Sequence, residues 1–187
     1  MTPRVALWRG INVGKAKRIA MADLRALLEG LGFERVATLL NSGNAVFRAV
    51  GSNHALADRI QATVERDLGV RSRVTVLAKS DLDEILAENP LPDAVHEPSR
   101  FLVSVLRESA DRAPAEALLD QNWSPDVFAL GRRAAYLWCP NGISAGRLAL
   151  AVDRALGERG TARNWATLQK LKALMEAAGR ARLDPHQ

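Results

Sequence analysis

The chain has 187 residues, 48% of them hydrophobic and 25% charged, which is enough to bury the core of one ordinary domain or of two small ones. A single cysteine, Cys139, excludes an intramolecular disulfide and suits a reducing cytoplasm. The sequence has no signal-peptide pattern and no run close to the roughly 20 apolar residues that span a bilayer, so we expect a cytoplasmic protein without a membrane partner.

The formal net charge of +5 is distributed unevenly along the chain. Residues 1–80 carry a net +7, residues 81–160 a net −5 and residues 161–187 a net +3. This asymmetry indicates either an anionic partner for the two outer segments or attraction between the halves of the fold. Solvated arginines on an arginine-rich chain are the alternative interpretation.

In chain order, the first eighty residues predict the elements βαββαβ. Four segments have strand-like composition: residues 5–8, 36–40, 45–50 and 73–78. Two segments have apolar residues at helical spacing: residues 21–31 and 54–68. Gly32 and Gly69 end these helices, Asn53 is predicted to cap the second one, and residues 41–44 form a hairpin turn.

The rest of the chain predicts a second, incomplete cycle, entered by a short helix that Ser80 and Asp83 begin and by a proline-rich connection at 89–98. Its predicted strands are residues 101–106, 127–130 and 134–138, and its predicted helices are residues 111–121, about 145–156 and 165–178. No last strand is predicted; instead, Asn164 caps the final helix and Gly179 closes it. The prediction is an α+β chain of two subdomains, 1–80 and 81–187, the second completed by C-terminal helices.

A glycine-hinged, cationic loop follows the first strand: residues 9–19 read RGINVGKAKRI and contain no acidic residue. In a βαββαβ unit the first and second strands run in the same direction, so this loop and the NSGN turn lie at one end of the sheet. Arg71 and Arg73, at the start of the fourth strand, reach the same end. Glycines there let backbone N–H groups approach an anion closely. The residues predicted to bind the anion are Arg9, Gly10, Asn12, Gly14, Lys15, Asn41, Ser42, Gly43 and Asn44.

The start of the last predicted helix is a second candidate for the same ligand. Unsatisfied N–H groups and the helix dipole favour an anion beside Thr161, Arg163 and Asn164. An ordinary N-cap at Asn164, with Trp165 as a core anchor, is the alternative. Capping does not require Arg163, so we expect its guanidinium to point at the ligand of the first loop, and the predicted site includes Arg163 and Asn164.

Four separated motifs are shared with one known family and occur in the same order: RGINVG at 9–14, MADLRALLEGLGF at 21–33, LNSGNAVF at 40–47 and TARNWATLQKL at 161–171. On these motifs the chain resembles the bacterial domain-of-unknown-function family 1697 over nearly its whole length. The resemblance implies two α+β subdomains of ferredoxin-like character. This agrees with the βαββαβ unit predicted over 1–80 and the βαββα(β) unit with a C-terminal helical segment predicted over 81–187. It implies no settled activity.

Other kinds of site fit the sequence poorly. The GxxxGK pattern at 10–15 is one residue shorter than a Walker A loop and lacks the following Ser or Thr. Aromatic residues, 5% of the chain, are too few for the base-stacking platform of an RNA-recognition motif. Cys139 and the histidines lack partners for nucleophilic or metal chemistry, and the acidic cluster at 81–84 complements a helix dipole. We therefore expect no metal and no cofactor.

Three functions stay open from the sequence. The first is a binding module for a phosphorylated or polyanionic ligand, either a phosphate-bearing small molecule or a nucleic-acid backbone. The second is an enzyme on a small anionic substrate, which Asn41, Ser42 and Asn44 would position or polarise. The third is a protein-interaction role in which the acidic middle segment meets a basic surface of another copy. The sequence does not fix the oligomeric state.

Overall fold

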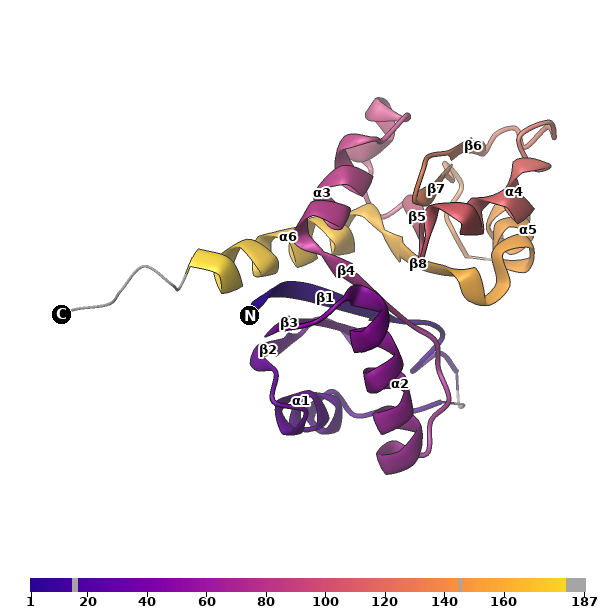
Figure 1. The fold of residues 1–187 in the computed structure, drawn as a ribbon. Coiled ribbons are helices and arrows are strands. Elements are labelled where there is room, and N and C mark those ends of the chain that lie inside the picture. Colours follow the sequence, from indigo (N-terminus) through magenta and orange to yellow (C-terminus); the bar gives the residue numbers. More distant parts are fainter. Residues whose placement is uncertain (15–16, 145, 181–187) are drawn as a thin grey trace. The chain divides into compact units, whose positions relative to one another are not determined.

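The fold is mixed α+β, with two four-stranded antiparallel sheets in the part of the chain that the structure describes. The structure is a computed structural model and describes residues 1–14, 17–144 and 146–180. The chain forms two compact units (Figure 1). Unit 1 contains Met1–Leu82 together with the chain from Lys170, and unit 2 contains Asp83–Gln169. The sequence-based division instead assigned all of residues 81–187 to the second subdomain.

Unit 1 has the predicted element order βαββαβ. Its elements are β1 (Thr2–Trp8), α1 (Met21–Gly30), β2 (Glu34–Thr38), β3 (Asn44–Ala49), α2 (Asn53–Leu68) and β4 (Val74–Ala78). The strands lie in the order β2-β3-β1-β4, and each neighbouring pair is antiparallel. Because β1 and β2 are both antiparallel to β3, they run in the same direction, as the sequence argument required.

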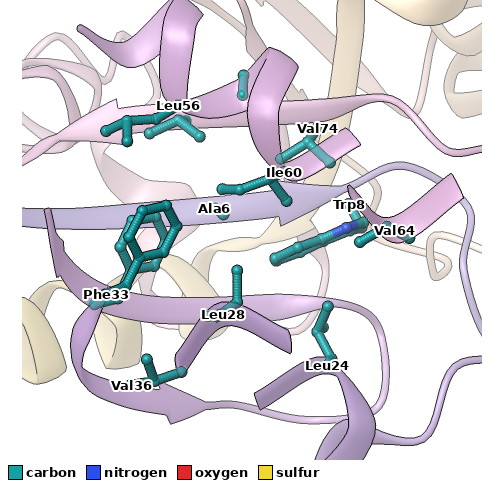
Figure 2. Close-up of a cluster of buried hydrophobic side chains, with 14 of the residues drawn as sticks. Ala6, Trp8, Leu24, Leu28, Phe33, Val36, Leu56, Ile60, Val64 and Val74 are labelled. Carbon is teal, nitrogen blue, oxygen red and sulfur yellow. The ribbon is translucent and has the colours of Figure 1, made fainter. Parts of the chain in front are cut away.

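The core of unit 1 lies between one face of this sheet and helices α1 and α2, which cover that face in Figure 1. Leu24 and Leu28 of α1 are four residues apart and therefore face the sheet together. Figure 2 shows them in one cluster with Trp8, which is fully buried at the end of β1. The rings of Phe33 and Phe47 stack with their centroids 4.6 Å apart. This packing fixes the end of β1, where the candidate site begins.

Helix α2 begins one residue earlier than predicted, because Ser52 rather than Asn53 is its N-cap. The Ser52 hydroxyl accepts a hydrogen bond from the Ala55 N–H at 3.2 Å. The side chain of Asn53 instead donates to Asp81 Oδ2 at 2.7 Å. Gly69 ends the helix in the left-handed conformation, with φ of 66°, as predicted.

Unit 2 repeats the same strand pattern with shorter helices. From the helix that enters unit 2 onward, the elements are α3 (Lys79–Ala87), η1 (Pro92–His96), β5 (Phe101–Leu106), η2 (Ser109–Arg112), α4 (Ala113–Glu116), β6 (Val127–Leu130), β7 (Ala134–Trp138), α5 (Arg147–Leu156), η3 (Gly157–Arg159), β8 (Gly160–Asn164) and α6 (Trp165–Arg180). Helix α6 begins in unit 2 and belongs to unit 1 from Lys170 onward. The strand order is β6-β7-β5-β8, again antiparallel throughout. Apolar residues of α4, α5 and the sheet form one core cluster.

Three predictions in this half were wrong. The last strand exists: β8 pairs with β5 from Gly160 opposite Leu106 to Asn164 opposite Leu102. Its sequence GTARN has no apolar alternation, so only pairing with β5 defines it as a strand. The helix predicted over 111–121 is reduced to η2 and α4, and α6 continues past Gly179 to Arg180. Within residues 1–14, 17–144 and 146–180, no helix is long and apolar enough to cross a membrane.

Candidate anion-binding corner

The end of β1, the β2–β3 turn and the start of β4 meet at one end of the unit 1 sheet. The backbone N–H of Trp8 donates to the Gly43 carbonyl at 2.9 Å, and the N–H of Arg9 donates to the Arg73 carbonyl at 2.9 Å. The Ser72 hydroxyl donates to the Arg9 carbonyl at 2.8 Å. The predicted convergence of the loop, the turn and the β4 start is therefore confirmed. We call residues 9–14, 17–20, 39–44 and 71–73 the unit 1 corner.

Asn12 holds the loop of the unit 1 corner in shape. Its N–H donates to the Lys17 carbonyl at 3.0 Å, and its side-chain Oδ1 accepts from the Ile19 N–H at 2.8 Å. Its Nδ2 donates to the carbonyls of Ile19 at 2.8 Å and of Asn41 at 2.7 Å. Asn12 thus closes the neck of the loop and ties it to the turn, so its amide is committed to the backbone. Lys15, which was also predicted to bind the anion, lies outside the described residues.

Asn44 and Gly43 hold the turn in a similar way. Asn44 is fully buried, and its Nδ2 donates to the Leu39 carbonyl at 2.8 Å and to the Ser42 hydroxyl at 3.0 Å. Gly43 has φ of 80°, and a Cβ placed there would lie 2.6 Å from Ile11 Cδ1. Gly43 and Asn44 were both predicted to bind an anion, but their contacts within the fold are enough to explain why a glycine and an asparagine occur at these positions.

The exposed part of the unit 1 corner is cationic. Its described residues include five cations and no acid: Arg9, Lys17, Arg18, Arg71 and Arg73. An ion pair at 2.6 Å with Glu65, on α2, neutralises one of them, Arg71. Among the other residues predicted to bind the anion in unit 1, those exposed to solvent are Gly10, Gly14, Asn41 and Ser42. Arg9 is half-buried.

Helix α1 begins directly after this loop, and no side chain caps it. Its N-cap residue is Ala20, which offers no side-chain oxygen to the first N–H groups of the helix. Asp23 in the first turn complements the helix dipole without capping it. Exposed N–H groups at a helix N-terminus add to the attraction of an anion by the neighbouring cations.

Unit 2 contains a corner with the same backbone pairing at the ends of its strands as the unit 1 corner. The N–H of Leu106 donates to the Arg133 carbonyl at 2.9 Å, as that of Trp8 does to Gly43. The N–H of Arg107 donates to the Arg159 carbonyl at 3.3 Å, as that of Arg9 does to Arg73. The strand registers agree, since Trp8 lies opposite Val74 in β4 just as Leu106 lies opposite Gly160 in β8. The pair Arg107 and Arg159 is thus the counterpart of Arg9 and Arg73.

The two corners differ in their acidic residues. Glu108 occupies the position of Gly10, and Glu158 occupies the position of Ser72. Asp111 adds a third carboxylate, with its Oδ1 3.9 Å from Arg159 Nε, and Arg132 forms an ion pair with Glu84. The unit 2 corner therefore contains carboxylates close to its arginines in sequence, whereas the described residues of the unit 1 corner include no acidic residue.

Arg163 and Asn164 lie in unit 2, at the end of β8. Asn164 is the N-cap of α6: its Oδ1 accepts from the N–H of Thr167 at 2.9 Å and from the hydroxyl of the same residue at 2.7 Å. Arg163 is only 8% exposed, and its Nη1 donates to the Ala162 carbonyl at 2.7 Å. Burial lowers the pKa of its guanidinium to about 10, so it stays charged at neutral pH. The capping role predicted for Asn164 is confirmed, and ligand binding by either residue stays a prediction.

Several groups elsewhere in the described part of the chain have displaced pKa values. Burial first, and then Asp126, raises the pKa of the Cys139 thiol to about 11, and burial also raises the pKa of Tyr136. The ion pair between Arg66 and Asp67, two exposed residues of α2, raises the pKa of the guanidinium and lowers the pKa of the carboxyl. The described residues contain no group of three or more His, Cys, Asp or Glu side chains that could hold a metal ion.

Several residues of the corner escaped the sequence-based prediction. Lys17 and Arg18 are exposed at the tip of the loop, and Arg18 Nη2 donates to the Gly14 carbonyl at 3.2 Å. Ser72 positions Arg9 through the backbone bond described above. Of these, the two loop cations could have been included from the charge of the RGINVGKAKRI segment alone, whereas the role of Ser72 depends on a contact between distant residues.

Comparison with known proteins gives a family and a fold. A family described as "Protein of unknown function (DUF1697)" matches residues 1–136. No curated protein matches. The solved structure of the conserved bacterial protein SP0830 from Streptococcus pneumoniae is similar, with a TM-score of 0.75 and 23% sequence identity over 93% of this chain and 98% of that one. At this identity the likeness shows the fold alone. On the family match, which includes every segment of the unit 1 corner, the chain belongs to the DUF1697 family of proteins of unknown function.

Proposed function

We propose that the unit 1 corner binds a phosphate-bearing polyanion. Its contacts would come from the side chains of Arg9 and Arg73, from the exposed cations Lys17 and Arg18, and from backbone N–H groups beside Gly10 and at the start of α1. Asn12, Gly43 and Asn44 would hold these groups in place without touching the ligand.

One observation carries this proposal: the same backbone geometry occurs twice, with carboxylates in one copy only. In unit 2 the pair Arg107 and Arg159 is accompanied by Glu108 and Glu158, whereas in unit 1 these two acidic positions are Gly10 and Ser72. The cationic excess in unit 1 therefore supports recognition of an external anion.

An enzyme on a small anionic substrate is less well supported by the geometry. Asn44 is fully buried with its amide bonded to Leu39 and Ser42, so it does not offer that amide to a substrate. A Cβ added at Gly10 or at Gly14 would meet no atom within 4 Å, which indicates open surroundings rather than an enclosed pocket.

We also infer that each unit has the ferredoxin-like arrangement. The support is the strand order β2-β3-β1-β4 in unit 1 and its counterpart β6-β7-β5-β8 in unit 2, both antiparallel. In unit 1 this order accompanies the βαββαβ succession of elements.

The proposal is tested by measuring the affinity of the protein for inorganic polyphosphate and for short single-stranded RNA at low salt. The double variant Arg9→Ala/Arg73→Ala is expected to lose about tenfold or more in affinity, because each arginine contact with a phosphate contributes on the order of 1 kcal/mol. The hydrogen bond between Arg9 and Arg73 joins backbone atoms, so the alanine variants keep it.

Arg107→Ala/Arg159→Ala is the matched control, since it removes two arginines from the equivalent position of unit 2. This control should bind polyphosphate as the unmodified protein does. Equal losses in the two double variants, or no binding by the unmodified protein at low salt, would show that the unit 1 corner is not the site.

A further inference from the structure

We propose that the polyanion recognised by the unit 1 corner is an anionic phospholipid surface, on which the corner docks with Val13 of its loop and Leu40 of its turn. This inference rests on the proposed function, because the same cations would meet the lipid phosphates. It adds two exposed aliphatic side chains, which a phosphate ligand alone does not use.

Leu40 is a leucine where neither the fold nor the backbone favours one. It is 53% exposed, so it contributes little to the core, and its φ of 58° lies in the left-handed region. A leucine pays a steric penalty in that conformation, whereas glycine or asparagine adopts it readily. A side chain that is both strained and exposed points to a role outside the folded core.

Val13 is a second exposed aliphatic residue beside the same hydrogen bond. It is 70% exposed and follows Asn12, whose Nδ2 donates to the Asn41 carbonyl at 2.7 Å. Leu40 immediately precedes Asn41 in the chain, so the two aliphatic residues each lie one position from a bond that joins the loop to the turn. They therefore belong to the same end of the sheet.

The cations of the corner surround these residues along the chain. Lys17 and Arg18 lie in the same loop as Val13, since the hydrogen bonds between the Asn12 side chain and the backbone of Ile19 close the neck of that loop. Arg9 and Arg73 lie at the sheet end from which loop and turn emerge. Aliphatic tips among cations fit a surface that offers phosphates outside and hydrocarbon beneath.

A lipid surface fits better than the other polyanions. Single-stranded nucleic acids bind through aromatic side chains that stack on bases, yet the exposed large hydrophobic residues of the described chain are all aliphatic: Met1, Val13, Leu40, Val50, Leu119, Val127 and Leu150. A small phosphate ligand would leave the side chains of Val13 and Leu40 exposed to water. The expectation of no membrane partner came from the lack of a spanning segment, and docking on a membrane surface needs no such segment.

The test measures binding to vesicles of phosphatidylcholine containing about a third phosphatidylglycerol, with vesicles of phosphatidylcholine alone and inorganic polyphosphate as separate arms. The unmodified protein should bind the anionic vesicles and not the neutral ones. Leu40→Asn and Val13→Asn should each weaken vesicle binding by about fivefold or more, and should leave polyphosphate binding unchanged. Arg9→Ala/Arg73→Ala should weaken both.

Leu150→Gln is the matched control, because Leu150 is 48% exposed on α5 of unit 2. It should not affect vesicle binding, and the melting temperature of Leu40→Asn should be no lower than that of the unmodified protein, which shows that any loss is not unfolding. Binding of polyphosphate without binding of vesicles, or vesicle binding that ignores Leu40 and Val13, would overturn the lipid inference alone. Loss of RNA binding in Leu40→Asn would also overturn it, in favour of a nucleic acid. Failure to bind polyphosphate would instead remove the proposed function.

Discussion

Gly43 and Gly10 both have a positive φ, yet only Gly43 is packed against other residues. A Cβ on Gly43 would lie 2.6 Å from Ile11 Cδ1 and 2.8 Å from Trp8 Cβ, whereas one on Gly10 would meet no atom within 4 Å. A substitution at Gly10 would therefore introduce backbone strain alone, whereas one at Gly43 would introduce both backbone strain and steric overlap. They also show which part of the corner is rigid, because Ile11 and Trp8 are both buried in the core of unit 1.

We predict that Gly43→Ala lowers the free energy of unfolding by about 2–4 kcal/mol, from left-handed strain plus overpacking. Gly10→Ala should cost only the strain, about 1 kcal/mol. Urea denaturation of both variants measures the difference. Similar losses in the two would mean that the contact of Gly43 with the core does not constrain the turn.

Two buried groups of unit 2 predict how stability depends on alkaline pH. Burial, followed by the charge of Asp126, raises the pKa of Cys139 from its ordinary 9.0 to about 11. Burial, followed by Glu88 and Glu84, raises the pKa of Tyr136 as well. Above about pH 9 the unfolded thiol loses its proton while the folded one keeps it, so the folded state binds more protons and the free energy of unfolding falls.

The expected result is a urea midpoint that decreases as the pH rises from about 8 to about 10. Cys139→Ala should decrease less over the same range, because it no longer has a thiol whose proton is held by folding. A midpoint that is constant or rises over this range would show that these groups are not buried as described.

At the scale of elements, the β2–β3 turn depends on one amide. Asn44 is fully buried and donates to the Leu39 carbonyl and the Ser42 hydroxyl, whereas Asn41 in the same turn is exposed. The turn presents Leu40, Asn41 and Ser42 to solvent only because Asn44 closes it from inside.

Asn44→Ala is therefore expected to lower the free energy of unfolding by about 1–3 kcal/mol, since it leaves buried polar groups without partners. Asn41→Ala, its control in the same turn, should stay within about 0.5 kcal/mol of the unmodified protein, because only the backbone carbonyl of Asn41 is used. Thermal melting of the two variants decides between them. A large loss in Asn41→Ala would mean that its side chain also supports the turn.

The elements of unit 1 could be predicted because each carries its own local pattern. Apolar spacing defined α1, and Gly69 marked the end of α2. Strand β8 could not be predicted in this way, since GTARN becomes a strand only through its register with β5. The choice between Ser52 and Asn53 as the cap of α2 also escaped the sequence, because Asn53 is used by the distant Asp81.

The position of the candidate site could be predicted from topology, but the roles of its residues could not. The direction of β1 and β2 was enough to bring the loop and the turn together. Asn12 and Asn44 were chosen as ligand-binding residues by their type, and the hydrogen bonds that commit them to the backbone join residues far apart in the sequence. The same limit hid Ser72, whose partner Arg9 is 63 positions away.

For the whole molecule, the repeated sheet order gives an internal comparison between units. The two corners share their backbone hydrogen bonds, and their acidic residues differ. The sequence is positively charged over residues 1–80 and negatively charged over residues 81–160. The two equivalent corners differ in charge in the same sense. This difference is the basis for the proposal that unit 1, rather than unit 2, recognises an anion.

The most direct measurement is the salt dependence of polyphosphate binding by the unmodified protein, by Arg9→Ala/Arg73→Ala and by Arg107→Ala/Arg159→Ala. Binding driven by phosphate contacts should weaken steeply as salt rises, and each contact removed should reduce the slope of log K against log salt by roughly 0.7–0.9. We predict a slope that is shallower by about 1.4–1.8 for the unit 1 variant and unchanged for the unit 2 variant. The same slope for all three proteins would contradict the assignment of the anion site to unit 1.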